Sequence, residues 1–172
     1  MSLENLLEQL PEYAKDLRLN LSSMMNNHND LTEDQFWGAI LVSAIASRNI
    51  EFLKVVRAEA ESKLSADAIK AANAAASIMA MNNIYYRFTH LVSNKEYSTM
   101  PAGLRMNIMR EITNKADFEL WSFAVSVING CGMCIDSHEK QLVKHEINKE
   151  STQLVAKIAA VVHAVAVTLE TQ

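Results

Sequence analysis

Both cysteines of the chain lie in one short segment, Cys-Gly-Met-Cys at residues 131–134. His138 follows the second cysteine by four residues, and Glu119 precedes the first by twelve. Two thiols at this spacing can form a disulfide, bind a metal ion or simply fill space in a core. A neighbouring imidazole and carboxylate could also move a thiol proton. This segment is therefore the first place in the sequence to look for chemistry.

The dithiol is expected at the start of a helix. Asn129-Gly130 is a helix-breaking pair, so we predict that a new helix begins at about Cys131 and runs to about His145. Cys134 then lies at i+3 and His138 at i+7 on the same face. Unpaired N–H groups in the first turn favour a thiolate at Cys131, whereas His138, one turn after Cys134, favours activation of that thiol. Spacing alone leaves the two assignments open.

Glu119 belongs to the preceding predicted helix, 118–128, where its neighbours are aromatic and aliphatic. A lone carboxylate in apolar surroundings is costly unless it has a partner. If the two helices form a hairpin across Asn129-Gly130, Glu119 could reach His138 and help to transfer protons. An exposed place in the first turn of its helix, where a carboxylate offsets the helix dipole, is an equally good interpretation.

Zinc binding is the main alternative to redox chemistry. Cys131, Cys134 and His138, with Glu119 or His145, would supply four ligands. Structural zinc sites usually combine two separated ligand pairs, and the sequence has no second Cys or His pair. We therefore expect no bound metal and no tightly bound cofactor. A zinc-stabilised or purely structural helical protein remains the rival from another functional class.

The composition is that of a globular, helix-rich protein. The 172 residues suffice for one domain, apolar residues make up 49%, and Gly 4 and Pro 2 are few. A net charge of −4, without a basic stripe, gives no support for nucleic-acid binding. No secretory signal or membrane-length apolar run is evident, so we expect a cytoplasmic protein away from membranes. In the cytoplasm a CxxC pair is more often redox-active or metal-binding than a structural disulfide.

Hydrophobic periodicity predicts an all-α fold, with no strand series. Thr32 with Gln35 forms a capping-box signature, and Ser65 and Asn148 are further N-cap candidates. We interpret His163, within the very apolar last helix, as a core histidine. The other expected helices cover 3–9, 11–21, 32–47, 50–63, 66–88 and 148–169, with an irregular stretch at 92–105.

The chain shows a weak internal repeat. A shift of 84 residues places 35–37 on 119–121, and a shift of 83 places the helix at 66–88 on the last helix. We therefore predict a single domain, 1–172, with related halves at about 1–90 and 91–172. Only the second half would carry chemistry, because the positions matching its two cysteines and histidine are Ser47, Ile50 and Lys54.

The pattern formed by Glu119, Cys131, Cys134 and His138 resembles that of the AhpD alkyl hydroperoxidase family, within the carboxymuconolactone decarboxylase-like superfamily. Segments spread over nearly the whole chain also resemble this family, among them LPEYAKDLRLNLSS, FWGAILVSAIASRN, AAASIMAMNNIYYRF and KADFELWSFAVSVINGC. The resemblance implies an all-α fold of two related halves, a homotrimer, and thiol-dependent peroxidase activity on alkyl hydroperoxides. A decarboxylase-like member of the superfamily is the alternative enzyme, although such members do not depend on a CxxC pair.

The resemblance also implies residue roles and partners. Cys134 would be oxidised to a sulfenic acid and would form the mixed disulfide with the peroxiredoxin AhpC, while Cys131 would donate a proton and close the disulfide. Glu119 and His138 match proton-relay positions. Electrons would come from dihydrolipoamide on a lipoylated acyltransferase, reduced by dihydrolipoamide dehydrogenase. Some family members have a histidine immediately before the second cysteine; Met133 stands there in this chain, so that role does not carry over.

Overall fold

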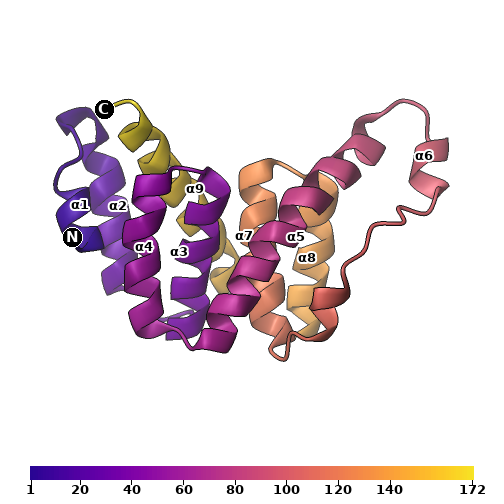
Figure 1. The fold of residues 1–172 in the computed structure, drawn as a ribbon, viewed down its shortest axis with the longest axis horizontal. Helices are drawn as coiled ribbons and strands as arrows, with labels where there is room; N and C mark the ends of the chain where they lie inside the picture. Colours follow the sequence, from indigo (N-terminus) through magenta and orange to yellow (C-terminus); the bar gives the residue numbers. More distant parts are fainter.

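The structure is a computed structural model that describes residues 1–172, and it contains helices and no strands (Figure 1). The predicted all-α fold is thus confirmed. In chain order the elements are α1 (Leu3–Leu7), the 3-10 helix η1 (Glu12–Ala14), α2 (Lys15–Asn26), α3 (Glu33–Ser47), α4 (Ile50–Lys63), α5 (Ala66–Leu91), α6 (Glu96–Thr99), the 3-10 helix η2 (Asn107–Arg110), α7 (Lys115–Asn129), α8 (Gly132–Lys144) and α9 (Lys149–Glu170).

Side-chain caps set the start of the main helices. Thr32 Oγ1 accepts from Gln35 N, and Gln35 Oε1 accepts from Thr32 N, so the predicted capping box of α3 is confirmed. Ser65 and Asn148 cap α5 and α9 in the predicted manner. Asn114 caps α7 as well. This cap was not predicted, and the predicted start of the helix, at 118, is three residues too late.

Other boundaries also differ from prediction: α1 ends at Leu7 instead of residue 9, and α5 continues to Leu91 instead of ending at residue 88. The helix expected at 11–21 is a short 3-10 turn followed by α2, which continues to Asn26 because Met24 and Met25 pack against the core. The stretch at 92–105 contains α6, whose start is stabilised by Asn94 Oδ1 accepting from Glu96 N. This segment forms an arm that extends away from the helical bundle (Figure 1).

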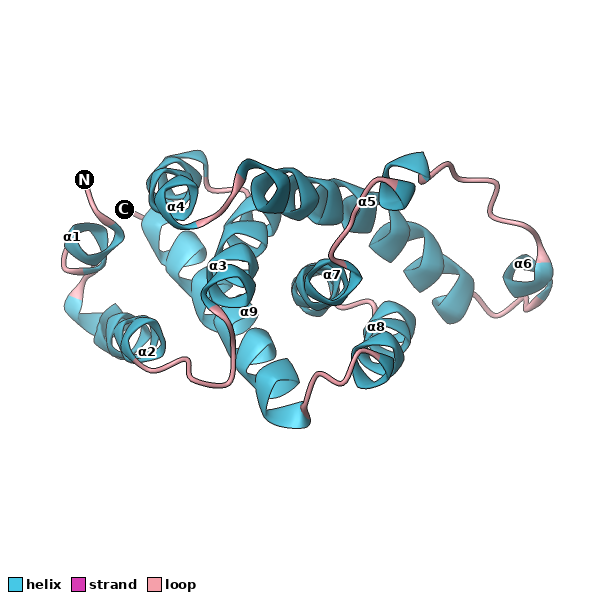
Figure 2. Ribbon diagram, turned by 90° about the horizontal axis from the view of Figure 1, so that it is seen from below, coloured by secondary structure: helices cyan, strands magenta, loops and turns pink.

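Two helical triplets of like order form the body of the molecule. The first comprises α3, α4 and α5, and the second α7, α8 and α9. α3 and α7 pack against each other at the centre. The first helix of each triplet also packs against the last helix of the other triplet: α3 contacts α9, and α7 contacts α5. Figure 2 views α3, α7 and α8 nearly end-on, with α5 and α9 crossing them. The relationship between the two halves stays a prediction.

The contact between α3 and α7 is close because Gly38 lacks a side chain. A Cβ atom at Gly38 would lie 2.1 Å from the Trp121 ring. The indole N–H of Trp121 donates to the carbonyl of Gln35 (3.2 Å), and the Gln35 side chain donates to Asp117 Oδ1 (3.0 Å). These bonds fix the first turns of the two central helices relative to each other, and α7 is the helix that carries Glu119.

α9 is a core helix, as predicted. It is long and apolar enough to cross a membrane by length and composition, but it packs against α2, α3 and α7, with Ile158, Val162 and Val165 fully buried. The prediction for His163 was wrong. This residue directly follows the buried Val162 and lies on the outer side of the helix, where its Nδ1 is 3.2 Å from Ser47 Oγ.

Candidate functional site

The two cysteines lie at the start of α8 and are joined by a disulfide. Gly130 ends α7 in the left-handed conformation (φ +64°), and Cys131 is the N-cap residue of α8. The helix begins at Gly132, within one residue of the predicted start. Cys134 therefore lies in the first turn, where unpaired backbone N–H groups favour a thiolate when the disulfide is opened.

The two sulfur-bearing residues differ in their surroundings. Cys131 is fully buried, whereas Cys134 is 6% exposed. Cys134 lines a cavity of about 330 Å³ between α5 and α8, and Cys131 does not. The other lining residues are Met79, Asn82, Tyr86, Met133, Ser137 and His138. A small molecule that enters this cavity therefore contacts Cys134 and not Cys131. The spacing in the sequence did not show which of the two thiols a substrate would reach.

His138 and Glu119 form a direct pair. Nδ1 of His138 lies 2.6 Å from Oε2 of Glu119, and the side chains are only 12% and 17% exposed. The chain turns at Gly130, and α7 and α8 form a helical hairpin. The interpretation in which Glu119 reaches His138 across this hairpin is therefore confirmed. The alternative, an exposed Glu119, is wrong, because the carboxylate turns toward the adjacent helix and away from water.

The second ring nitrogen of His138 also has a partner. Nε2 lies 3.2 Å from Sδ of Met79, a buried residue of α5. A carboxylate and a thioether are both acceptors, so the ring can donate to both only as an imidazolium; the neutral ring donates to one of them. The two contacts hold the imidazole one turn after Cys134. No sequence signal linked Met79 to the dithiol.

Buried amides hold the end of α7 just before the dithiol. Asn83 of α5 donates to Ser126 Oγ (2.8 Å) and accepts from the Asn129 side chain (3.0 Å). Ser126 also accepts, through its carbonyl, from the N–H of Cys131 (3.2 Å). These hydrogen bonds tie the position of the dithiol to α5.

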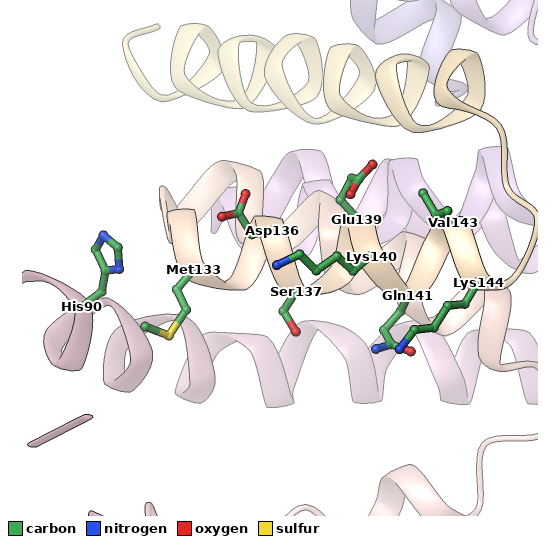
Figure 3. Close-up of a pocket in the computed structure, with 9 residues that line it drawn as sticks. All are labelled: His90, Met133, Asp136, Ser137, Glu139, Lys140, Gln141, Val143 and Lys144. Atoms are coloured by element: carbon green, nitrogen blue, oxygen red, sulfur yellow. The ribbon is translucent and has the colours of Figure 1, made fainter. Parts of the chain in front are cut away.

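An open groove of about 670 Å³ runs along α8 outside the cavity. Met133 and Ser137 line both the groove and the cavity, so the two spaces adjoin at these residues. Figure 3 shows the groove side chains along α8, with His90 of α5 at one end. They are His90, Met133, Asp136, Ser137, Glu139, Lys140, Gln141, Val143 and Lys144.

The ligand set of the zinc alternative is not assembled in the structure. No group of three or more His, Cys, Asp or Glu side chains is placed to hold a metal ion. The two cysteines are bonded to each other, and His138 faces Glu119 and Met79. His145 is exposed at the far end of α8, where it forms the C-cap.

Asp117 is a second buried carboxylate on α7, two residues before Glu119. Burial raises the pKa of its carboxyl above the usual range, the negative charge of Asp34 acts in the same direction, and the hydrogen bond from Gln35 acts against them. The Asn114 side chain donates to its other oxygen at 2.6 Å. Asp117 was not a predicted site residue, and its partners place it at the junction of α3 and α7.

The chain is similar to known proteins over its whole length. The Carboxymuconolactone decarboxylase family profile matches residues 95–170, which include the dithiol. "Alkyl hydroperoxide reductase AhpD" of Rhodopseudomonas palustris (strain BisA53) is 53% identical over 99% of this chain and 94% of its own length. The proteins of the same name from Streptomyces coelicolor and Maricaulis maris are 53% and 54% identical, over 100% and 98% of this chain and 97% and 98% of their own lengths.

Proposed function

Because this chain belongs to the AhpD family of alkyl hydroperoxide reductases, and is therefore an oxidoreductase of the peroxidase class, we propose that its Cys131–Cys134 dithiol reduces organic hydroperoxides and is restored by a dithiol donor. One observation carries the proposal. Cys134 borders a cavity, is bonded to the buried Cys131, and lies one helical turn from the His138–Glu119 pair. Nucleophile, resolving thiol and proton carrier are thus within one small site.

In the peroxide step, the Cys134 thiolate attacks the terminal oxygen of the hydroperoxide. A sulfur–oxygen bond forms, the oxygen–oxygen bond breaks, and the alkoxide leaves as an alcohol after taking a proton. The assignment to Cys134 is supported by its place on the cavity wall. His138 accepts the thiol proton and returns it to the alkoxide, while Glu119 stabilises the imidazolium between the two events.

In the second step, the Cys131 thiol attacks the Cys134 sulfenic acid. Water leaves, and the product is the disulfide that the structure contains. Burial of Cys131 supports this resolving role, because a hydroperoxide in the cavity does not meet it. The two steps together consume one hydroperoxide and convert two thiols into one disulfide.

Dihydrolipoamide is the proposed electron donor, carried by a lipoylated acyltransferase and reduced by dihydrolipoamide dehydrogenase. Its thiols would open the disulfide by exchange through a mixed-disulfide intermediate. The peroxiredoxin AhpC is the proposed protein that receives electrons from the dithiol through Cys134. The open groove along α8 supports both exchanges, because it adjoins the cavity of Cys134 at Met133 and Ser137.

The proposed assembly is a cytoplasmic homotrimer, which binds neither membrane nor nucleic acid. Large apolar side chains are exposed at the end of α5 and along the arm that follows it, namely Phe88, Leu91, Tyr97 and Met100. Apolar surface gathered on a projecting segment is typical of an interaction site, which supports self-association through this arm (Figure 1).

A cycling experiment tests the function directly. Reduced protein is mixed with one equivalent of tert-butyl hydroperoxide, its thiols are counted, and dihydrolipoamide is then added. We expect two thiols per chain to disappear and then to return, with formation of tert-butanol. Persistence of both thiols after hydroperoxide would contradict the proposal. Metal analysis of the same sample addresses the zinc alternative.

A further inference from the structure

Asn82 lies on the cavity wall opposite the helix that carries the dithiol, and only one end of its amide has a hydrogen-bond partner. It is 8% exposed, and its Nδ2 donates to Sδ of Met106 (3.1 Å). No protein group donates to its buried Oδ1. The adjacent Asn83, by contrast, is hydrogen-bonded through both ends of its amide. A buried carbonyl without a partner is costly and unusual, so it calls for a functional explanation.

The cavity around Asn82 combines a buried acceptor without a partner, one reactive sulfur and an apolar wall. Met79, Asn82 and Tyr86 are spaced at i, i+3 and i+7 on α5, so they share the face that lines the cavity. Met133, Cys134, Ser137 and His138 line it from α8. The thioether and aromatic side chains supply apolar surface, and the Asn82 carbonyl is available to a donor inside the cavity.

An organic hydroperoxide has the complementary set of groups. Its single O–H donor is on the terminal oxygen, which is the atom that a thiolate attacks, and its carbon group is apolar. We propose that Asn82 Oδ1 accepts a hydrogen bond from this O–H and holds the terminal oxygen at Cys134, with the carbon group against Tyr86 and Met133. This inference rests on the proposed function and assigns the substrate subsite of the same reaction.

The hydrogen bond can persist through the reaction. As the Cys134 thiolate bonds to the terminal oxygen, the electron pair of the oxygen–oxygen bond leaves with the alkoxide, which takes a proton from the His138 imidazolium. The terminal oxygen keeps its hydrogen and becomes the hydroxyl of the Cys134 sulfenic acid. The same O–H therefore faces Asn82 before and after the attack, and Asn82 orients both the substrate and the oxidised cysteine.

The test separates the two half-reactions in Asn82→Leu, which keeps a similar volume and removes the carbonyl. Oxidation of the pre-reduced protein by tert-butyl hydroperoxide is followed by thiol counting. We expect its second-order rate constant to fall about tenfold or more, as for the loss of one substrate hydrogen bond. The rate at which dithiothreitol reopens the disulfide should stay unchanged, because that step does not use the hydroperoxide. Asn73→Leu, the same change on α5 away from the cavity, should leave both rates unchanged.

A second variant tests the acceptor itself. Asn82→Asp keeps an oxygen at the same place, so the ratio of its oxidation rate to that of the wild type should be near one in acid. The ratio should fall as the new carboxylate ionises beside the thiolate. A ratio near one in acid, together with the slow oxidation of Asn82→Leu, would assign the effect to the oxygen atom and not to the shape of the side chain.

The possible outcomes are distinct. If hydroperoxide oxidises the wild type and Asn82→Leu at the same rate, the inference about Asn82 is overturned while the proposed function stands. If the wild type itself is not oxidised, the proposed function fails. If Asn82→Leu does not fold, the Asn82→Asp ratio in acid decides, and a rate well below that of the wild type there, where the neutral carboxyl keeps its oxygen, overturns the inference.

Discussion

Glu119 Oε2 lies 2.6 Å from His138 Nδ1 and thereby joins α7 to α8 beside the disulfide. A short contact between a carboxylate and an imidazole in a poorly exposed site is a strong, charge-assisted hydrogen bond when the ring is protonated. In the proposed mechanism it orients the ring and stabilises the imidazolium that forms when His138 takes a thiol proton. The proposed relay therefore depends on the hairpin geometry as much as on residue type.

Glu119→Gln should slow oxidation of the reduced dithiol by about 100-fold, the lower end of the usual range for lost acid–base catalysis. The reason is that a neutral amide does not stabilise the imidazolium. The rate constant for tert-butyl hydroperoxide, measured as a function of pH, should show a changed profile, and His138→Gln should change it in the same way. Glu61→Gln, at an exposed position on α4 away from the dithiol, is the matched control. Unchanged profiles in both relay variants would remove the relay from the mechanism.

The two cysteines should give different products when they are replaced singly. In Cys131→Ser, Cys134 should still react with hydroperoxide and stop at the sulfenic acid, which dimedone traps and mass spectrometry locates. In Cys134→Ser, no sulfenic acid should form, because the remaining thiol is buried and does not line the cavity. Circular dichroism checks that both variants stay folded. Sulfenic acid trapped at Cys131 in place of Cys134 would reverse the assigned roles.

Local signals in the sequence predicted the helices well and the site in part. The caps at Thr32, Ser65 and Asn148 and the break at Gly130 depend on neighbouring residues, so a short window contains the necessary information. The face shared by the dithiol and His138 also follows from spacing within one helix.

Contacts between distant segments of the chain could not be predicted from these local signals. Met79 and Asn82 reach the cavity from α5, roughly 50 residues before the dithiol, and only the packing of α5 on α7 and α8 places them there. The sequence identified His138 as a possible partner of Glu119, but it did not show whether Glu119 contacts His138 or faces solvent. That outcome depends on the rotation of α7 about its axis. His163 was misplaced because an apolar helix permits more than one buried face, and tertiary packing selects among them.

Gly38→Ala should destabilise the fold by about 1–3 kcal/mol or more, the range typical of an overfilled core. The new Cβ would lie 2.1 Å from the Trp121 ring, between the central helices α3 and α7. Urea unfolding followed by tryptophan fluorescence measures the change. Gly132→Ala is the matched control, because nothing lies within 4 Å of a Cβ there and its φ is not positive. Equal stability of Gly38→Ala and the wild type would mean that α3 and α7 separate easily.

Asp117 should make stability depend on pH in a direction opposite to that of an ordinary ion-paired carboxylate. Burial raises the pKa of its carboxyl in the folded state, so the folded protein holds this proton more tightly than the unfolded chain does. Stability from this group is present at low pH. It is lost as the pH rises from the usual carboxyl value, about 4, through the raised value of the folded state.

Asp117→Asn removes this titration. Thermal melts at a series of pH values should therefore show the Tm of the wild type falling relative to that of Asp117→Asn as the pH rises through this window. The reason is that the unfolded wild type releases the Asp117 proton more readily than the folded protein does, whereas asparagine has no proton to release. Asp34→Asn, which changes an exposed neighbour whose charge adds to the raised pKa, should reduce the pH dependence without abolishing it. A constant difference in Tm between wild type and Asp117→Asn across the window would contradict a raised pKa at this site. A difference that grows in the other direction would mean that the hydrogen bonds from Gln35 and Asn114 outweigh burial.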